Sequence, residues 1–309
     1  MPNKITLEHG MIFNIDEIDE SMIDKPLEHL KQMNIQSMWD KGYQGEGITI
    51  AILDSGCDIN HPYLKDKIVH KYNLTKDDDT DRDNVTDYIG HGTHIASLIV
   101  SDNYNGVIAG VSPKANLLIY KVIDKDAIAD YNVVAQGVYA AAQRGADIIN
   151  VSLGGSEPAP QIHEAIKSAL RMGCLVVCAS GNEGDGNEET VELLYPGCYQ
   201  ECVQVGAMDN DYAITNFSNT NQFIDCVANG NALLGFVKDN KIMALSGTSQ
   251  SVPLVCGALA LLKEYGRKEL SKELNAYELY DLLLKNTKSI PNVSENQQGH
   301  GYVYFKEGV

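Results

Sequence analysis

Residues 48–54 read Ile-Thr-Ile-Ala-Ile-Leu-Asp, an apolar run of strand length that ends on a carboxylate. Similar runs follow at 117–123, 147–153, 174–179 and 202–207. Runs that are apolar on both faces are typical of strands buried within a parallel sheet. The stretches between them are typical of helices, at 91–101, 132–144, 161–172 and 249–265. This alternation predicts an α/β fold with a central, mostly parallel sheet and helices on both faces.

Three glycine-flanked motifs carry chemistry. Asp54 lies in Ile-Leu-Asp-Ser-Gly, His91 in Gly-His-Gly-Thr-His and Ser249 in Gly-Thr-Ser-Gln-Ser-Val-Pro. A serine nucleophile needs an imidazole to take its proton, and the imidazole needs a carboxylate to fix its tautomer and stabilise its cation. The three residues are therefore candidate catalytic residues of a hydrolase.

The order of these motifs, with the acid first, then the base and then the serine, is the order found in subtilisin. On these motifs the chain resembles the subtilisin-like serine proteases, and it is most similar to the intracellular subtilisins of Gram-positive bacteria. The resemblance runs from about Trp39 to about Tyr265. It implies a serine endopeptidase in which Ser249 attacks the peptide carbonyl, His91 transfers the proton and Asp54 orients His91.

A fourth motif, Ala-Ser-Gly-Asn-Glu-Gly at 179–184, resembles the family segment that supplies the oxyanion-hole asparagine. Asn182 is the matching residue. Ser249 also opens a helix-like stretch, and a helix N-terminus directs backbone N–H groups and positive potential at developing negative charge. The resemblance therefore implies that Asn182 and the Ser249 amide stabilise the oxyanion.

The resemblance also implies a substrate groove. Family substrates bind in an extended conformation as an added strand. The matching edge segment is Ser152, Leu153, Gly154 and Gly155, and Tyr131 matches a position that lines the pocket four residues upstream of the cut. Glu183 puts acid beside the primary specificity pocket and predicts acceptance of a basic or amide-bearing side chain. Leu194 takes the place of a smaller residue and predicts a shorter pocket.

Residues 1–40 are acidic and mixed in pattern, so we expect an N-terminal extension over 1–40 and a peptidase domain over 41–309. The intracellular subtilisins carry an extension that lies across the active site through a Leu-Ile-Pro-Tyr/Phe motif. Here residues 10–13 read Gly-Met-Ile-Phe at about that distance, without the proline. Two interpretations remain open: the segment blocks the active site, or its apolar side chains pack on the domain.

The composition limits which partners and which cellular compartment the chain is suited to. The 309 residues carry a net charge of −18, which argues against nucleic acid and anionic membranes and either steers cationic peptides or serves solubility alone. The seven cysteines are an odd number in apolar runs, which favours buried thiols in a reducing compartment. The N-terminus lacks the pattern of a secretion signal, and no segment reaches the ~20 apolar residues of a membrane span. We therefore expect a cytoplasmic protein whose partners are extended peptides or proteins, with its oligomeric state open.

The triad needs no organic cofactor. Residues 61–64 read His-Pro-Tyr-Leu where the family has His-Pro-Asp-Leu, and the phenol replaces a carboxylate ligand of calcium. This argues against a tight calcium site, although the loop 102–107 can still offer carbonyls. A weaker cation site of the family maps to Gly197, Tyr199, Cys202 and Asp225. The acidic run at 77–83 predicts either a solvated loop or a cation site.

Two biological roles fit this chemistry: intracellular protein turnover, and dedicated precursor processing such as the removal of bacteriocin or lantibiotic leader peptides. Three features favour the dedicated role: the altered sequence after Ser249, Gln-Ser-Val-Pro-Leu-Val; Leu194; and the N-terminal segment, whose block is weakened by the missing proline. A hypothesis of another class is a catalytically silent subtilisin-like protein that binds and regulates other proteins. The presence of the whole triad and of Asn182 favours the enzyme.

Overall fold

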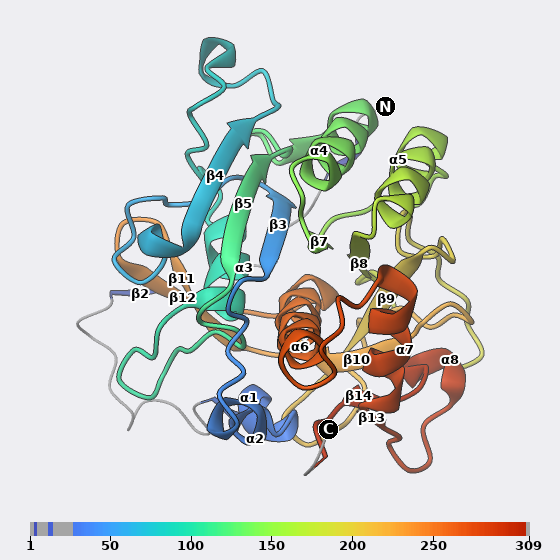
Figure 1. Cartoon of the computed structure of the whole chain (residues 1–309). Coiled ribbons are helices and arrows are strands. Elements are labelled where there is room, and N and C mark those ends of the chain that lie inside the picture. Colours follow the sequence, from blue (N-terminus) through green and yellow to red (C-terminus); the bar gives the residue numbers. More distant parts are fainter. Residues whose placement is uncertain (1–2, 5–11, 15–26, 307–309) are drawn as a thin grey trace.

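A nine-stranded sheet runs through the centre of the molecule (Figure 1). The computed structural model describes residues 3–4, 12–14 and 27–306. The strand order is β13-β14-β10-β9-β8-β7-β3-β5-β4, and every pairing is parallel except that of β13 with β14. The strands are β3 (Thr49–Asp54), β4 (Ile68–Asn73), β5 (Asn116–Lys121), β7 (Ile148–Val151), β8 (Leu175–Ala179), β9 (Cys202–Met208), β10 (Cys226–Asn229), β13 (Thr287–Lys288) and β14 (Tyr302–Val303).

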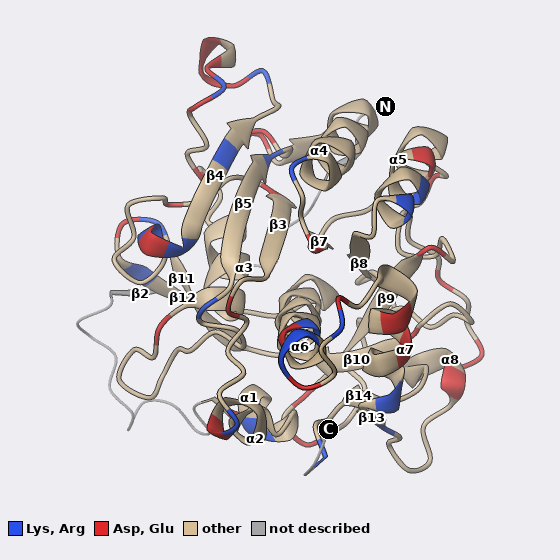
Figure 2. Cartoon of the chain, viewed as in Figure 1, with Lys and Arg blue, Asp and Glu red and all other residues tan. Residues whose placement is uncertain are grey.

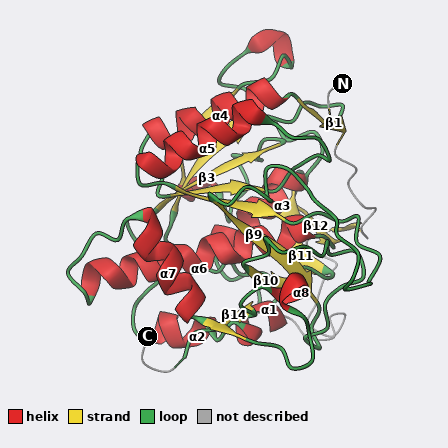
Figure 3. Cartoon of the chain, turned by 90° about the vertical axis from the view of Figure 1, so that its right-hand side faces the viewer, coloured by secondary structure: helices red, strands yellow, loops and turns green. Residues whose placement is uncertain are grey.

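The sheet is buried on both faces because its strands alternate between two cores. In β3, Ile50 and Ile52 pack in the core formed with α3 (His91–Val100) and α6 (Thr248–Lys268). Ala51 and Leu53 pack in the core formed with α4 (Tyr131–Gln143) and α5 (Pro160–Arg171). Figure 3 shows α4 and α5 on one side of the strands and α6 with α7 (Ala276–Lys285) on the other. The predicted α/β fold is confirmed.

A second, three-stranded sheet lies beside α3. Its hairpin of β11 (Leu233–Val237) and β12 (Lys241–Leu245) is antiparallel, and β2 (Ile12–Asn14) pairs with the outer edge of β12. His94 in α3 holds this hairpin, since its Nε2 lies 3.1 Å from the Leu233 carbonyl and 3.2 Å from that of Met243. The hairpin leads directly into the start of α6.

The N-terminal segment also contributes to a third pairing. Its first strand, β1 (Asn3–Lys4), runs antiparallel to β6 (Ile128–Ala129). The backbone of residues 3–4 and 12–14 therefore pairs with two separate strands of the domain. Met11, one of the apolar residues named above, lies outside the described residues.

Residues 28–40 fell within the expected extension, and they form α1 (Glu28–Gln32) and α2 (Ile35–Asp40). Their apolar side chains are buried in the same core as α3 and α6: Leu30, Met33, Ile35 and Met38. The core therefore includes chain that precedes residue 41. The remaining elements are short, namely η3 (Lys65–Lys67), η4 (Asp78–Thr80) and α8 (Glu295–Gln298).

The surface carries the acidic excess of the sequence. Figure 2 shows Asp and Glu spread over loops and helix faces, including the loop around η4 at the top of the view. All seven cysteines are buried, as their apolar surroundings in the sequence predict. Among the described residues, no helix is long and apolar enough to cross a bilayer.

Candidate active site

Asp54 and His91 form a buried pair at the carboxyl end of β3. Asp54 is the last residue of β3 and His91 is the first residue of α3. His91 Nδ1 lies 2.8 Å from Asp54 Oδ1 and 3.0 Å from Oδ2. A carboxylate can only accept from Nδ1, so this contact favours the proton on Nδ1 and leaves Nε2 as the acceptor.

The glycines around His91 allow α3 to start this close to β3. A Cβ on Gly92 would lie 2.1 Å from the Gly56 carbonyl oxygen and 3.2 Å from the Cβ of Asp54. Gly90, just before the helix, has a φ of +92°, which L side chains rarely adopt. The motif Gly-His-Gly is therefore a packing requirement as well as a catalytic signature.

The surroundings of His91 change the acidity of its imidazolium. Burial lowers the pKa of His91, but the charge and hydrogen bond of Asp54 and the charge of Asp87 outweigh this effect. The pKa of His91 is therefore raised above its ordinary value of 6.5. The site stabilises the cationic imidazole, which is the state that a general base reaches after taking a proton.

Ser249 occupies the first turn of α6, after Thr248. Its Oγ donates to the Ser152 carbonyl oxygen at 3.2 Å, and among the described residues no hydrogen bond joins it to His91. Pro253 lies inside α6, where its missing N–H leaves the Ser249 carbonyl without its helical donor. The Ser152 Oγ donates to that carbonyl instead, at 2.9 Å. Ser152 therefore contacts Ser249 through both its hydroxyl and its carbonyl.

Asn182 follows β8 and faces the start of α6. Its Oδ1 accepts from the Thr248 N–H at 2.8 Å and from the Thr248 hydroxyl at 3.0 Å. Because the amide oxygen is held by these two donors, the amide nitrogen Nδ2 is left to donate elsewhere. The contact with Thr248 places Asn182 beside the first turn of α6. The N–H groups of that turn have no partner within the helix.

The segment from Ser152 to Gly155 follows β7 directly, at the carboxyl end of the sheet where Asp54 also lies. Gly155 forms an antiparallel bridge with Tyr195, with N–H to O distances of 2.9 Å and 2.8 Å. Leu153 is buried, and a Cβ on Gly154 would lie 2.5 Å from Leu194 Cδ2. The 152–155 segment is thus backed on one side by Leu194 and Tyr195.

Of the remaining predicted binding residues, one begins a helix and the other lies on a loop. Tyr131 is the first residue of α4, and its hydroxyl donates to the Glu157 carbonyl at 3.1 Å. Glu183 is exposed, and its carboxylate accepts from the Asn182 N–H at 3.0 Å. The Glu183 N–H donates to Asn219 Oδ1 at 2.8 Å. The Glu183 carboxylate is therefore already engaged by its own loop.

Sequence reasoning missed several residues that support this site: Ser55, Asp87, Lys121, Asn219 and Thr248. A signal for Asp87 was present, because an Asp shortly before a helix start is typical of capping. Thr248 lies next to Ser249 in the motif itself. The contact of Asn219 with Glu183 joins residues that are 36 positions apart, and no local pattern marks it.

The segments that would hold calcium do not fit that ion. Tyr63 stacks on Phe236 with ring centroids 5.1 Å apart, and Tyr104 packs edge-on against Phe236 at 5.8 Å. Oxygen atoms of the loop 102–107 are used internally, since Val107 N–H donates to the Tyr104 carbonyl at 2.8 Å. Asp102 pairs with Lys67 at 3.2 Å. Aromatic rings and a lysine stand where calcium would need free oxygen ligands.

The other two candidate cation regions are also occupied by protein groups. In the acidic run, Asp77 accepts from the Lys125 N–H at 2.8 Å and pairs with the buried Lys121 at 3.3 Å. In the weaker site, Asp225 accepts from the Tyr280 hydroxyl at 2.5 Å and from the Gln204 N–H at 2.7 Å. Within residues 27–306 and the two short N-terminal strands, no cluster of three or more His, Cys, Asp or Glu is arranged to hold a metal ion.

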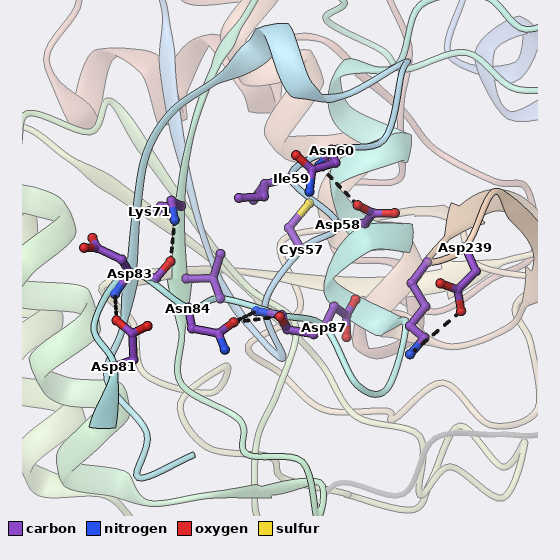
Figure 4. A pocket seen from close by; sticks show the side chains of 13 residues that line it. Cys57, Asp58, Ile59, Asn60, Lys71, Asp81, Asp83, Asn84, Asp87 and Asp239 are labelled. Atoms are coloured by element: carbon purple, nitrogen blue, oxygen red, sulfur yellow. Dashed lines mark hydrogen bonds and ion pairs between the residues drawn. The ribbon is translucent and has the colours of Figure 1, made fainter. Parts of the chain in front are cut away.

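A pocket of about 430 Å³ lies next to the end of β3 (Figure 4). Lys71 and Asp239 line it at opposite sides, and Cys57, Asp58 and Asp87 lie between them. The Asp87 residue is only 1% exposed, so its carboxylate belongs to the protein interior. Asp54 is not among the residues that line the pocket, so the pocket borders the end of β3 without opening on the Asp54 carboxylate.

Known proteins match this chain over most of its length. The model of the subtilase family, peptidase S8, matches residues 45–301. The intracellular serine protease of Paenibacillus polymyxa is 42% identical over 287 residues, which cover 93% of this chain and 87% of the relative. The major intracellular serine protease of Bacillus subtilis (strain 168) is 41% identical over 279 residues, 90% of this chain and 87% of the relative. Thermitase of Thermoactinomyces vulgaris is 34% identical over 231 residues, 74% of this chain and 79% of the relative.

Proposed function

Because the chain belongs to the subtilase family, we propose that it hydrolyses peptide bonds with Ser249 as the nucleophile, His91 as the general base and Asp54 as the residue that orients His91. The observation that carries this proposal is the contact of His91 Nδ1 with Asp54, 2.8 Å long and almost fully buried. It leaves His91 Nε2 free to take the serine proton.

The chemistry then proceeds in two halves. Ser249 Oγ attacks the carbonyl carbon of the substrate while its proton passes to His91 Nε2, and the carbonyl oxygen becomes an oxyanion. Asn182 Nδ2 and the Ser249 N–H donate to that oxygen at the N-terminus of α6. His91 gives its proton to the leaving amine as the acyl-enzyme forms, and water repeats the steps to release the acid. Before attack, Ser249 Oγ must rotate away from the Ser152 carbonyl that it contacts at 3.2 Å.

We expect an extended peptide as the substrate, bound along Ser152, Leu153, Gly154 and Gly155 with Tyr131 at the pocket four residues upstream of the cut. The side chain of Leu194, 8% exposed, lies against Gly154 and reduces the space on that side of the groove. The Glu183 carboxylate is engaged by the Asn182 N–H. These two contacts favour a small residue before the scissile bond over the basic or amide-bearing one that Glu183 predicted.

The N-terminal segment is proposed to regulate this groove. Residues 3–4 pair with β6, which ends two residues before Tyr131. Residues 12–14 pair with β12, which ends four residues before Ser249. The backbone of the extension thus pairs with strands that lead to the groove and to the nucleophile, which favours the blocking interpretation over simple packing.

No organic cofactor is needed for these steps, and we propose that the enzyme also works without calcium. The stacking of Tyr63 on Phe236 and the Lys67–Asp102 pair support this. We further propose that the protein acts inside the cell, as the relatives from Paenibacillus polymyxa and Bacillus subtilis, both named intracellular serine proteases, are named to do. Nucleic acid is not an expected partner at a net charge of −18.

Two roles remain candidates: intracellular protein turnover and dedicated processing of a precursor such as a bacteriocin or lantibiotic leader. The Leu194 contact favours the dedicated role, since a narrow groove accepts fewer bonds. Digestion of casein and of a library of peptides separates the two. Broad cleavage of casein supports turnover, while cleavage of few peptides and little casein supports dedicated processing.

Intact mass after incubation with an active-site fluorophosphonate tests the proposed chemistry. Wild type should gain one label and Ser249→Ala none. Loss of an N-terminal segment from wild type alone would support self-processing of the extension. If neither protein is labelled although both are folded, the triad assignment is wrong and the catalytically silent, regulatory alternative gains support.

A further inference from the structure

Asp87 is a buried carboxylate that the peptide-hydrolysis mechanism does not use. Its Oδ1 accepts from the Ser55 hydroxyl at 2.8 Å and from the Gly90 N–H at 2.7 Å. Its Oδ2 accepts from the Thr93 N–H at 2.8 Å and from the Thr93 hydroxyl at 2.7 Å. Asp87 therefore joins the end of β3, the loop before α3 and the first turn of α3. These are the three pieces of backbone that set the position of His91 relative to Asp54.

Ser55 connects Asp87 to the catalytic acid. The Ser55 Oγ lies 2.8 Å from Asp87 Oδ1 and 3.1 Å from Asp54 Oδ1, and it accepts from the Gly92 N–H at 3.0 Å. A hydroxyl has one proton to donate, so the two carboxylates share it. A continuous chain of hydrogen bonds thus runs from Asp87 through Ser55 and Asp54 to His91.

The charges around His91 make this chain electrostatically significant. The titratable groups that face His91 are Asp54 from β3, Asp87 from the preceding loop and His94 from α3. Burial lowers the pKa of His94 to about 4, so His94 is neutral at working pH. Behind Ser55, the buried Lys121 ammonium donates to the Ser55 carbonyl at 2.8 Å. Two anions therefore act on His91 in a buried site where solvent screens charge poorly.

We propose that Asp87 is a positioning residue for the reaction: through Ser55 and the first turn of α3 it holds His91 against Asp54, and its charge assists that of Asp54 when His91 becomes cationic. The inference rests on the proposed function and deepens it. Asp87 does not touch the substrate or the reacting atoms in this account. It acts through Asp54 and His91.

The test is the Asp87→Asn variant of the full-length protein, assayed on a chromogenic peptide with alanine before the cut. Asn keeps the size of the side chain but removes the charge and places an N–H₂ group among donors. We expect kcat to fall about tenfold with KM within about twofold. Removing a nearby anion makes the imidazolium more acidic, so the acidic limb of kcat/KM should move down by about half a pH unit or more.

The matched control is Asp147→Asn, at the opposite end of β3. Asp147 also accepts a backbone N–H, from Thr49 at 2.8 Å, and pairs with Lys263 at 2.7 Å. The Asp147→Asn variant should have a lower Tm, with kcat and the acidic limb of kcat/KM unchanged. If Asp87→Asn leaves both kinetic quantities at their wild-type values, or if Asp147→Asn moves them equally, the proposal is overturned.

Ser55→Ala keeps the test decisive should Asp87→Asn fail to fold. The proposal expects Ser55→Ala alone to lower kcat, and an unchanged kcat would overturn it. Where Asp87→Asn folds, the double variant should lose no more activity than the slower single variant. Multiplying losses would overturn the route through Ser55. Fluorophosphonate labelling of wild type separates the two levels of inference: an unlabelled wild type contradicts the proposed function, while a labelled wild type with an unaffected Asp87→Asn contradicts only the role of Asp87.

Discussion

Leu194 packs directly on Gly154, so closely that a Cβ on Gly154 would lie 2.5 Å from Leu194 Cδ2 and 2.7 Å from Cγ. The antiparallel bridge between Gly155 and Tyr195 holds the two segments at this separation. Gly154 belongs to the proposed substrate edge. Under the proposed function, Leu194 would therefore limit which side chains fit beside Gly154.

Shortening Leu194 should broaden the specificity. We expect Leu194→Ala to raise the ratio of kcat/KM for a peptide with phenylalanine before the cut to that for alanine by about tenfold, since a few methylene groups in an apolar pocket change binding by about 1–3 kcal/mol. The control is Leu193→Ala, at a neighbouring side chain that is 39% exposed. An unchanged ratio in Leu194→Ala would mean that this side chain does not border the bound substrate.

The acidic limb of the pH–activity profile should report His91. The general base must be neutral, and its pKa is raised above 6.5 by the charge and hydrogen bond of Asp54 and the charge of Asp87, which outweigh burial. Activity should therefore rise with pH through a midpoint above 6.5, measured as kcat/KM and as the rate of fluorophosphonate labelling. A midpoint at or below 6.5 would contradict the electrostatic account.

The raised pKa of His91 also predicts how stability depends on pH, and this dependence runs opposite to that of activity. A histidine whose folded pKa is raised contributes stability that is complete below pH 6.5 and is lost as pH rises through the folded pKa. Replacement by His91→Gln should therefore lower Tm more at pH values below that window than above it. Equal differences on both sides would show that folding does not favour the cationic form of His91.

Asn182 should affect turnover and not the nucleophile. Asn182→Ala is expected to lower kcat by about 10²–10³, the loss known for removal of the side-chain oxyanion donor in subtilisin, a member of this family. Labelling at Ser249 should persist, only more slowly. Thr248→Val is the companion variant, because it removes the hydroxyl that donates to Asn182 Oδ1 at 3.0 Å while keeping the Thr248 N–H donor. It should cost less than Asn182→Ala, and a larger loss would contradict the assignment of Asn182 as the donor.

The parts of this molecule that sequence could predict are those in which a local pattern has one physical solution. The run 48–54 is apolar on both faces, so it could only be an inner strand, and it is β3. The glycines at 90 and 92 were visible as a motif, and their close packing on β3 explains why. The fold, the family and the serine-protease class are confirmed by the sheet order and by the relatives.

The missed elements are short or depend on distant partners. Helices α1 and α2 have 5 and 6 residues, too few for a helical period to be read, and both begin after a residue of positive φ. The β11–β12 hairpin turns at Asp239 and Asn240, which both have positive φ, so its turn signal was present. The hydrogen bonds of Asp87 to Ser55, Gly90 and Thr93 form because α3 begins beside the end of β3, which is a relation of tertiary structure.

Asp225 is expected to destabilise the folded protein at neutral pH. Burial raises its pKa to about 6, although hydrogen bonds from Tyr280 and the Gln204 N–H oppose this. The folded state thus binds the proton more tightly, so stability is greatest below the ordinary pKa of 3.8 and falls as pH rises through about 6. Asp225→Asn should raise the free energy of unfolding at pH 8 by an amount on the order of 2 kcal/mol and have little effect near pH 4. Destabilisation at pH 8 would instead indicate that a cation binds the Asp225 carboxylate. The control is Asp281→Asn, at an exposed residue that follows Tyr280 in the sequence.

Calcium should not stabilise this protein. An ion present at 100 times its dissociation constant would stabilise by about 2.7 kcal/mol, and each kcal/mol changes the Tm of a domain of about 150–250 residues by about 2–4 °C. Equal Tm values in a chelator and in millimolar calcium are therefore expected, because aromatic packing takes the place of the ion. Phe236, fully buried against Tyr63 and Tyr104, should carry that stability, and Phe236→Ala should cost about 3–5 kcal/mol. Tyr277→Ala, at a ring that is 67% exposed, is the control and should change Tm little. A rise of several degrees on adding calcium to wild type would contradict the expectation that the ion does not bind.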